Sequence, residues 1–214
     1  MYGLVILLFL SAVFAQLEVD RPCNFTNIPH ETTFSASITG TWYQIERIPN
    51  SVETGECSRS VLRISTEIVI EANVTSVQTG YKYDSEVVNG KLVLRNATIA
   101  NMTDDGIVQA AYDDVTQDYV VLGTDYTEYL VLYSCRNSGS RSMISAWKYG
   151  RNTTYSEIAA NTTRTLVENA NINTTTWKTV SHSAEACKVT GAAASLRISP
   201  IILLIIGFVL AKEL

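Results

Sequence analysis

The feature that most constrains the fold is a series of short β-type runs between Gly40 and Tyr149. Runs rich in Val, Ile, Tyr, Leu and Thr alternate with Gly, Asn and Asp, which is the pattern of strands joined by turns. Asn89-Gly90 predicts a tight hairpin. We expect strands within 38–48, 60–73 (one or two strands), 78–88 (weaker and irregular), 92–99, 107–112, 119–124, 129–135 and 143–149. This series predicts an all-β, eight-stranded antiparallel up-and-down barrel.

After Arg151 the apolar period changes from that of a strand to that of a helix. Thr154 or Ser156 can cap the start of this helix. The expected apolar stripe, which would pack on the side of the barrel, consists of Ile158, Ala159, Thr162, Leu166 and Ala170. Asn161 falls on the opposite face, and 174–180 is expected to form a last strand.

The first residues have the composition of a secretory signal peptide, which we assign to 1–15 with cleavage after Ala15. The alternative is an N-terminal anchor helix. The apolar run is shorter than the ~20 residues that a bilayer-spanning helix needs, so we favour cleavage.

The last residues have the order of a glycosylphosphatidylinositol (GPI) attachment signal: small residues, a spacer and an apolar tail at 201–210. We expect attachment at Gly191, with Ala192 and Ala193 as alternatives, and removal of 192–214 as a propeptide. The alternative is a transmembrane helix, but 198–211 is shorter than the ~17–25 residues required. One domain, 16–191, remains between the two signals.

Passage through the secretory pathway predicts disulfides and N-linked glycans. The chain has seven Asn-x-Thr sequons, at Asn24, Asn73, Asn96, Asn101, Asn152, Asn161 and Asn173. Its cysteines, Cys23, Cys57, Cys135 and Cys187, allow three pairings that spacing alone cannot distinguish. They show no Cys-x-x-Cys pattern, and with His30 and His182 as the sole histidines we expect no metal site. The net charge of −5, without a basic cluster, disfavours nucleic-acid binding.

Three segments together resemble the lipocalin family, in the form of its apolipoprotein D branch. Gly40-Thr41-Trp42-Tyr43 through Pro49 resembles the first lipocalin motif, and Thr124-Asp125-Tyr126 with the following run 129–135 resembles the second. The segment Ala146–Asn152 resembles the third motif and includes its arginine, Arg151. Lys148-Tyr149-Gly150 departs from the apolar residues common before that arginine.

This resemblance implies a barrel open at one end, with one C-terminal helix on its side. Trp42 would plug the closed end beneath Arg151, Asp125 and Tyr126 would form the adjoining turn, and Gly40 would be a structural residue of the same motifs. It also implies the disulfides Cys23–Cys135 and Cys57–Cys187. The interior walls would be apolar, without a basic residue inside. By position, the residues expected to line the pocket are Trp147, Tyr119, Tyr112 and Leu62.

The expected function is a non-enzymatic carrier at the extracellular face of the cell membrane, or secreted, that binds a fatty acid, sterol or pigment. It would be attached to the membrane through the GPI anchor, with no cofactor, no nucleic acid and no identified protein partner. A role in neuronal development or lipid handling would follow from the same resemblance. The alternative is a recognition or adhesion glycoprotein that uses the barrel as a scaffold. His30 lies near the N-terminus and His182 lies near Cys187, and we expect each to be an ordinary surface histidine, which disfavours triad chemistry.

Overall fold

The structure is a computed structural model that describes residues 17–71, 73–172 and 177–190. The expected signal peptide and GPI propeptide therefore lie outside the described residues, as do Asn173 and residues 174–176 of the expected strand 174–180. The elements in chain order are β1 (Leu17–Val19), the 3₁₀ helix η1 (Ala36–Ile38), β2 (Gly40–Arg47), β3 (Glu56–Glu71), β4 (Asn73–Val88), β5 (Lys91–Met102), β6 (Val108–Ala111), β7 (Thr116–Thr124), β8 (Tyr129–Ser138), β9 (Arg141–Gly150), α1 (Glu157–Asn169) and β10 (Lys178–Thr179).

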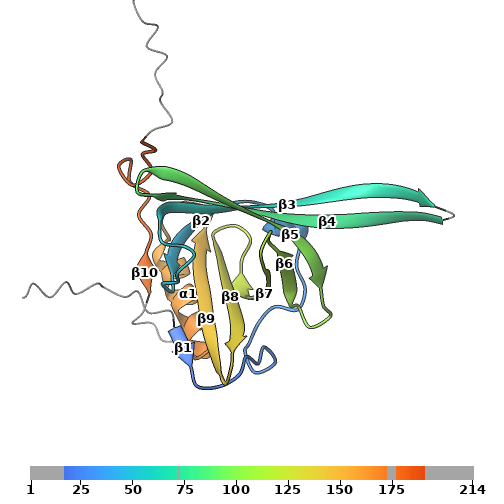
Figure 1. Ribbon diagram of the computed structural model, residues 1–214, viewed down its shortest axis with the longest axis horizontal. Helices are drawn as coiled ribbons and strands as arrows, with labels where there is room; N and C mark the ends of the chain where they lie inside the picture. Colours follow the sequence, from blue (N-terminus) through green and yellow to red (C-terminus); the bar gives the residue numbers. More distant parts are fainter. Residues whose placement is uncertain (1–16, 72, 173–176, 191–214) are drawn as a thin grey trace, which may run out of the picture.

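Strands β2 to β9 form a closed antiparallel barrel (Figure 1). Each strand pairs with the next along the chain, and β2 also pairs with β9 to complete the ring. The short strands β1 and β10 add to the edges of β9 and β2. Asn89 and Gly90 both have positive φ in the turn between β4 and β5, as the tight hairpin requires. The predicted eight-stranded barrel with one helix on its side is confirmed.

Strands β3 and β4 continue beyond the barrel as a two-stranded arm (Figure 1). The prediction of weak, irregular structure at 78–88 was wrong, and 60–73 contributes one strand. The register is continuous from Arg59↔Ser85 to Glu71↔Asn73. Strand β4 pairs with β5 from Gly80 to Val88, so the earlier residues of β4 pair with β3 alone.

The two ends of the barrel follow from the register. Strand β2 begins at Gly40, which pairs with Leu62 near the middle of β3, and its start marks the end from which the arm projects. Because neighbouring strands are antiparallel, the β4–β5 turn and the β8–β9 turn lie at the opposite end. We call the end near Gly40 the base and the opposite end the mouth.

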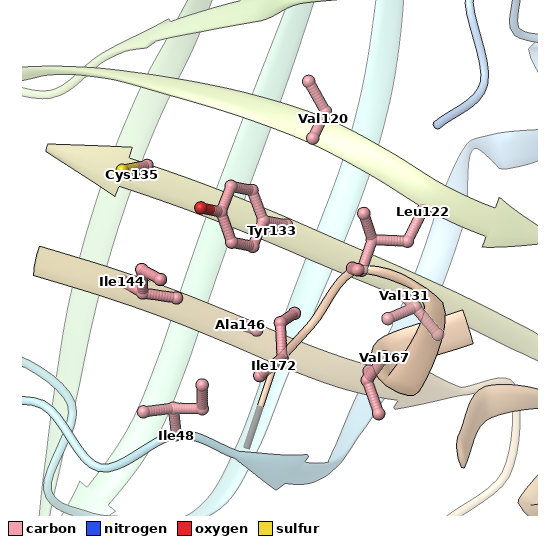
Figure 2. Packing of buried hydrophobic residues seen from close by; sticks show 11 residues of the cluster. Ile48, Val120, Leu122, Val131, Tyr133, Cys135, Ile144, Ala146, Val167 and Ile172 are labelled. Carbon is pink, nitrogen blue, oxygen red and sulfur yellow. The ribbon is translucent and has the colours of Figure 1, made fainter. Parts of the chain in front are cut away.

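Two hydrophobic cores lie on the two sides of the barrel wall. The outer core fills the space between β7, β8, β9 and α1, where Val167 faces Val131 and Leu122 (Figure 2). Helix α1 approaches β7 closely at Gly123, where a Cβ atom would lie 2.7 Å from Leu166 Cδ1. The inner core includes Trp42 and alternates with the outer core along each strand, as period-2 geometry requires.

The predicted apolar stripe of the helix was partly wrong. The helix begins after Ser156, whose side chain accepts a hydrogen bond from Ala159 N. Its buried side chains are Ala159, Thr163 and Val167, which follow one another at four-residue spacing. Ile158 is instead 79% exposed. Compared with the prediction, the helix is rotated about its axis so that Thr163 faces the barrel, and the Thr163 hydroxyl donates to Ala160 O.

Two disulfides fix the segments that flank the barrel. Cys23–Cys135 joins the N-terminal segment to β8, and Cys57–Cys187 joins β3 to the C-terminal segment. These are the two pairings that the lipocalin resemblance implies, and the described chain contains no free cysteine.

Candidate functional site

The base of the barrel is closed by an arginine stacked on a buried indole. The Arg151 Cζ lies 3.6 Å from the ring centroid of Trp42, which has no exposed surface. The guanidinium also donates to the carbonyls of Ser37, Thr39, Thr41 and Tyr126. One side chain therefore joins η1, the start of β2 and the β7–β8 turn.

The turn beside this plug is organised by Asp125. Its carboxylate accepts backbone N–H bonds from Thr127, Glu128 and Tyr129. Partial burial acts to raise the pKa of Asp125, but these N–H groups outweigh it and hold the pKa below its ordinary value. Tyr126 has a φ of 64°, and its hydroxyl accepts a hydrogen bond from Ser35 N. The residues of the second motif thus have a structural role.

A cavity of about 340 Å³ occupies the part of the barrel nearest the base. We call it the basal cavity. Strands β3, β5, β6, β7 and β8 contribute aliphatic side chains to it, and the segment before β2 contributes Phe34 and Ile38. Its apolar lining residues are Phe34, Ala36, Ile38, Leu62, Ile64, Ile99, Met102, Val108, Val121 and Leu132. Lys82 and Tyr119 are also part of its wall. This cavity can hold a mostly apolar molecule.

A second cavity, of about 370 Å³, lies at the mouth and has a mixed polar and apolar lining. Its wall includes Arg95, Gln117 and Ser134, and the loop between β2 and β3 covers it with Glu53. The Glu53 carboxylate accepts a hydrogen bond from the Trp147 indole N–H. The two cavities share no lining residue.

A hydrogen-bonded group of four side chains lies between the cavities, and we call it the central network. It consists of Lys82, Asp84, Tyr112 and Tyr119. The Lys82 ammonium forms an ion pair with Asp84 Oδ2 and donates to the Tyr112 hydroxyl at 3.3 Å. The two tyrosine hydroxyls are 2.9 Å apart. The other carboxylate oxygen, Asp84 Oδ1, is buried and has no hydrogen-bond donor among the described residues.

The electrostatics of this network favour a charged pair surrounded by neutral phenols. Burial alone would lower the pKa of Lys82, but the Asp84 carboxylate outweighs it, so the pKa is raised. Burial raises the pKa of Tyr112 and Tyr119, and the Asp84 charge adds to the rise at Tyr112. The ammonium therefore stays protonated, while its charge is compensated locally.

The prediction of a wholly apolar interior without a basic residue was wrong. Lys82, Asp84 and Glu86 alternate along β4, and closure of the barrel turns this face inward. Tyr81 and Tyr83 lie on the other face and stack at 6.1 Å. In the sequence, charges at alternate positions beside tyrosines indicate that the charged side chains face solvent. In the structure these charged side chains face the barrel interior instead.

The structure brings together the four residues predicted to line the pocket, all within the inner core. Leu62 and Tyr119 line the basal cavity, and Trp147 lines the mouth cavity. The rings of Tyr119 and Trp147 are in contact, with centroids 5.6 Å apart. Tyr112 belongs to the central network and lines neither of these two cavities. Lys82 and Asp84 are the site residues that sequence reasoning missed.

Other sequence features lie outside the barrel interior. The sequon asparagines whose exposure is described are all exposed, namely Asn24, Asn96, Asn152 and Asn161. His30 bonds the carbonyls of Ile28 and Asp105, and His182 bonds that of Gln44. Lys148 points outward to an ion pair with Glu46 at 2.6 Å, which explains the polar residue in the third motif. Within the described residues, no helix is long and apolar enough to cross a bilayer.

Comparison with known proteins identifies the family. The model of the "Lipocalin / cytosolic fatty-acid binding protein family" matches residues 39–184. Apolipoprotein D of Oryctolagus cuniculus is 31% identical over 98 residues, which are 45% of this chain and 48% of that protein. Apolipoprotein D of Bos taurus is 32% identical over 106 residues, with 45% and 48% covered. The chain thus spans about half the length of the curated relatives it matches.

Solved structures show the same fold at low sequence identity. Insecticyanin of the tobacco hornworm Manduca sexta has a TM-score of 0.66 and 15% identity, with 82% of this chain and 94% of that chain covered. H1 crustacyanin of the lobster Homarus americanus has a TM-score of 0.62 and 18% identity, covering 79% and 93%. The family model covers most of the domain, and the barrel has the expected closed end with Arg151 stacked on Trp42. The chain therefore belongs to the lipocalin / cytosolic fatty-acid binding protein family.

Proposed function

We propose that the protein binds one small, mostly apolar ligand inside the barrel and acts as a carrier without enzymatic activity. The basal cavity carries this proposal, because about 340 Å³ is bounded largely by aliphatic side chains. Burial of ~300 Å² of apolar ligand surface would provide ~7.5 kcal/mol before association costs. Those costs leave an affinity near the micromolar range.

The central network favours a ligand with a hydrogen-bond donor over a free fatty acid. The Lys82 ammonium is already compensated by Asp84, so it offers little net attraction for a carboxylate. The residues of the network that line the basal cavity are Lys82 and Tyr119, and the Tyr119 oxygen can accept a hydrogen bond from a ligand O–H group. Among the fatty acids, sterols and pigments that the family resemblance implies, we therefore propose a hydroxyl-bearing molecule such as a sterol.

We further propose that the carrier is a glycoprotein tethered by a GPI anchor at Gly191, or at Ala192 or Ala193, on the extracellular face of the cell membrane. The small-residue, spacer and apolar-tail order of 191–214 supports the tether. Two disulfides and the exposed sequons support an oxidising, extracellular compartment. This combination resembles that of Lazarillo, an insect cell-surface lipocalin, and on this resemblance we propose a role in neuronal development or lipid handling. A secreted form is the alternative.

The β3–β4 arm favours a second candidate function, recognition or adhesion at the cell surface. The arm extends beyond the barrel and pairs with no other described strand, so its edges can contact another molecule (Figure 1). The two functions are compatible, because one uses the interior and the other the exterior.

A titration of the purified full chain with a fluorescent sterol and a fluorescent fatty acid tests the carrier function. Val108→Trp would fill the basal cavity, and Ile158→Trp on the exposed side of α1 is the matched control. We expect saturable binding with tighter sterol affinity, a loss of at least tenfold in Val108→Trp, and no change in the control. Absence of saturable binding to the wild-type chain would refute the proposal. Cell aggregation that persists in Val108→Trp would support adhesion independently of the pocket.

A further inference from the structure

The described chain ends at the mouth of the barrel. The Thr190 N–H donates to the carbonyl of Gly90 at 2.7 Å, in the turn between β4 and β5. Three residues earlier, the Cys57–Cys187 disulfide holds the same segment against the start of β3. Figure 1 shows the C-terminal segment lying beside the β4–β5 turn. Whatever follows Thr190 therefore departs from the rim of the mouth.

Exposed apolar side chains lie close in sequence to the two residues of this contact, Gly90 and Thr190. Leu92 and Leu94 lie on the outer face of β5, directly after the turn, and are 53% and 63% exposed. Val189, next to Thr190, is 38% exposed. Lys91 and Lys188 flank them and are also exposed. We call these five residues the rim patch.

We propose that the rim patch rests on the outer surface of the lipid bilayer, so that the mouth lies beside the membrane. This inference depends on the proposed tether. Gly191 follows Thr190 directly, so an anchor there would hold the patch at high effective concentration near the lipid. Leucine and valine then enter the interface, while the two lysines can extend toward the headgroups.

The sequon positions limit how the protein can lie on the bilayer. Asn152 follows β9 at the base, so a glycan there would lie at the end of the barrel opposite the mouth. Asn96 lies on the same outer face of β5 as Leu94, two residues further along, or about 6.6 Å. A glycan at Asn96 would border the rim patch and confine contact to the tip of the hairpin. Asn24 lies near the β8–β9 turn, because the N–H of Cys23 beside it donates to Asn137 Oδ1.

The inference predicts where lipid contacts the protein. The full chain would be purified with its anchor and reconstituted into phosphatidylcholine vesicles whose acyl chains carry bromine, which quenches a nearby indole. Leu92→Trp adds an indole to the rim patch, and Leu94→Trp is a second variant on the same face. Ile158→Trp, on exposed α1 near the base, is the matched control. We expect loss of the added emission in both patch variants and none in the control.

Flotation and quenching together test the tether and the orientation separately. Vesicle flotation with selective quenching supports both. Flotation with no quenching, or with equal quenching at the patch and at Ile158→Trp, overturns the orientation while the tether stands. Failure of the wild-type chain to float overturns the tether and the orientation together, without affecting ligand binding in the basal cavity. Vesicle-independent dimers that protect the Leu92→Trp indole would assign the patch to a second copy and overturn the bilayer as its partner.

Discussion

Replacement of Arg151 by alanine should weaken the base of the barrel by an amount that the structure allows us to estimate. The substitution removes the stack on Trp42, whose indole is fully buried, and this contact is worth ~2 kcal/mol when desolvated. It also removes the guanidinium hydrogen bonds to the carbonyls of Ser37, Thr39, Thr41 and Tyr126. Water can replace part of these bonds, so we assign them ~2 kcal/mol together.

The expected loss is therefore ~4 kcal/mol for Arg151→Ala, or a decrease of roughly 8–16 °C in Tm. Arg151→Lys keeps a charge but loses the planar fork, and should lose about half as much. Urea denaturation followed by tryptophan fluorescence measures both values. Arg164→Ala, which removes an exposed bond to Asn161, is the control and should change stability by less than ~0.5 kcal/mol. A loss below ~1 kcal/mol for Arg151→Ala would show that the stack does not hold the base.

Three further predictions concern stability. Lys82→Met should lose ~3–5 kcal/mol of stability because it leaves a buried Asp84 carboxylate unpaired. The double variant Lys82→Met with Asp84→Leu should be much closer to wild type in thermal denaturation. A double variant less stable than Lys82→Met alone would contradict the ion pair. Because the folded pKa of Asp125 is lowered, its contribution to stability is present above about pH 3.8 and is lost as the pH falls through the folded pKa. Asp125 is largely exposed, so we expect Asp125→Ala to lower the Tm only slightly at neutral pH. In strong acid the difference in Tm between Asp125→Ala and the wild type should vanish. Joint replacement of Cys57 and Cys187 by serine should cost up to ~5 kcal/mol in the chain-entropy model, given their separation of 130 residues; an unchanged denaturation midpoint would refute that role.

The strand positions and the Asn89-Gly90 hairpin were predictable because turn chemistry and β propensity are local properties. The packing of Arg151 on Trp42 followed from the family resemblance, since a lone Gly-x-Trp carries little information. The length of the arm was not predictable. Continuous pairing of β3 with β4 is a property of two strands together, and neither strand alone shows a clear alternation.

The polar interior was the main feature that the sequence concealed. Alternation along β4 separates Lys82 and Asp84 from Tyr81 and Tyr83, but it cannot show which face closes inward. Hydropathy favours burial of the tyrosine face, but the hydrogen bonds of the central network place the Lys82 and Asp84 face inside the barrel. The same limit applies to α1, where Ile158 is more apolar than the buried Thr163.

Mass spectrometry of the small molecules that co-purify with the glycosylated full chain tests the carrier function most directly. We predict one hydroxyl-bearing apolar molecule per barrel in the wild-type protein and in Ile158→Trp, and its loss from Val108→Trp. Protein that carries no such molecule and takes up none when incubated with sterol would contradict the assignment of the basal cavity as a ligand site.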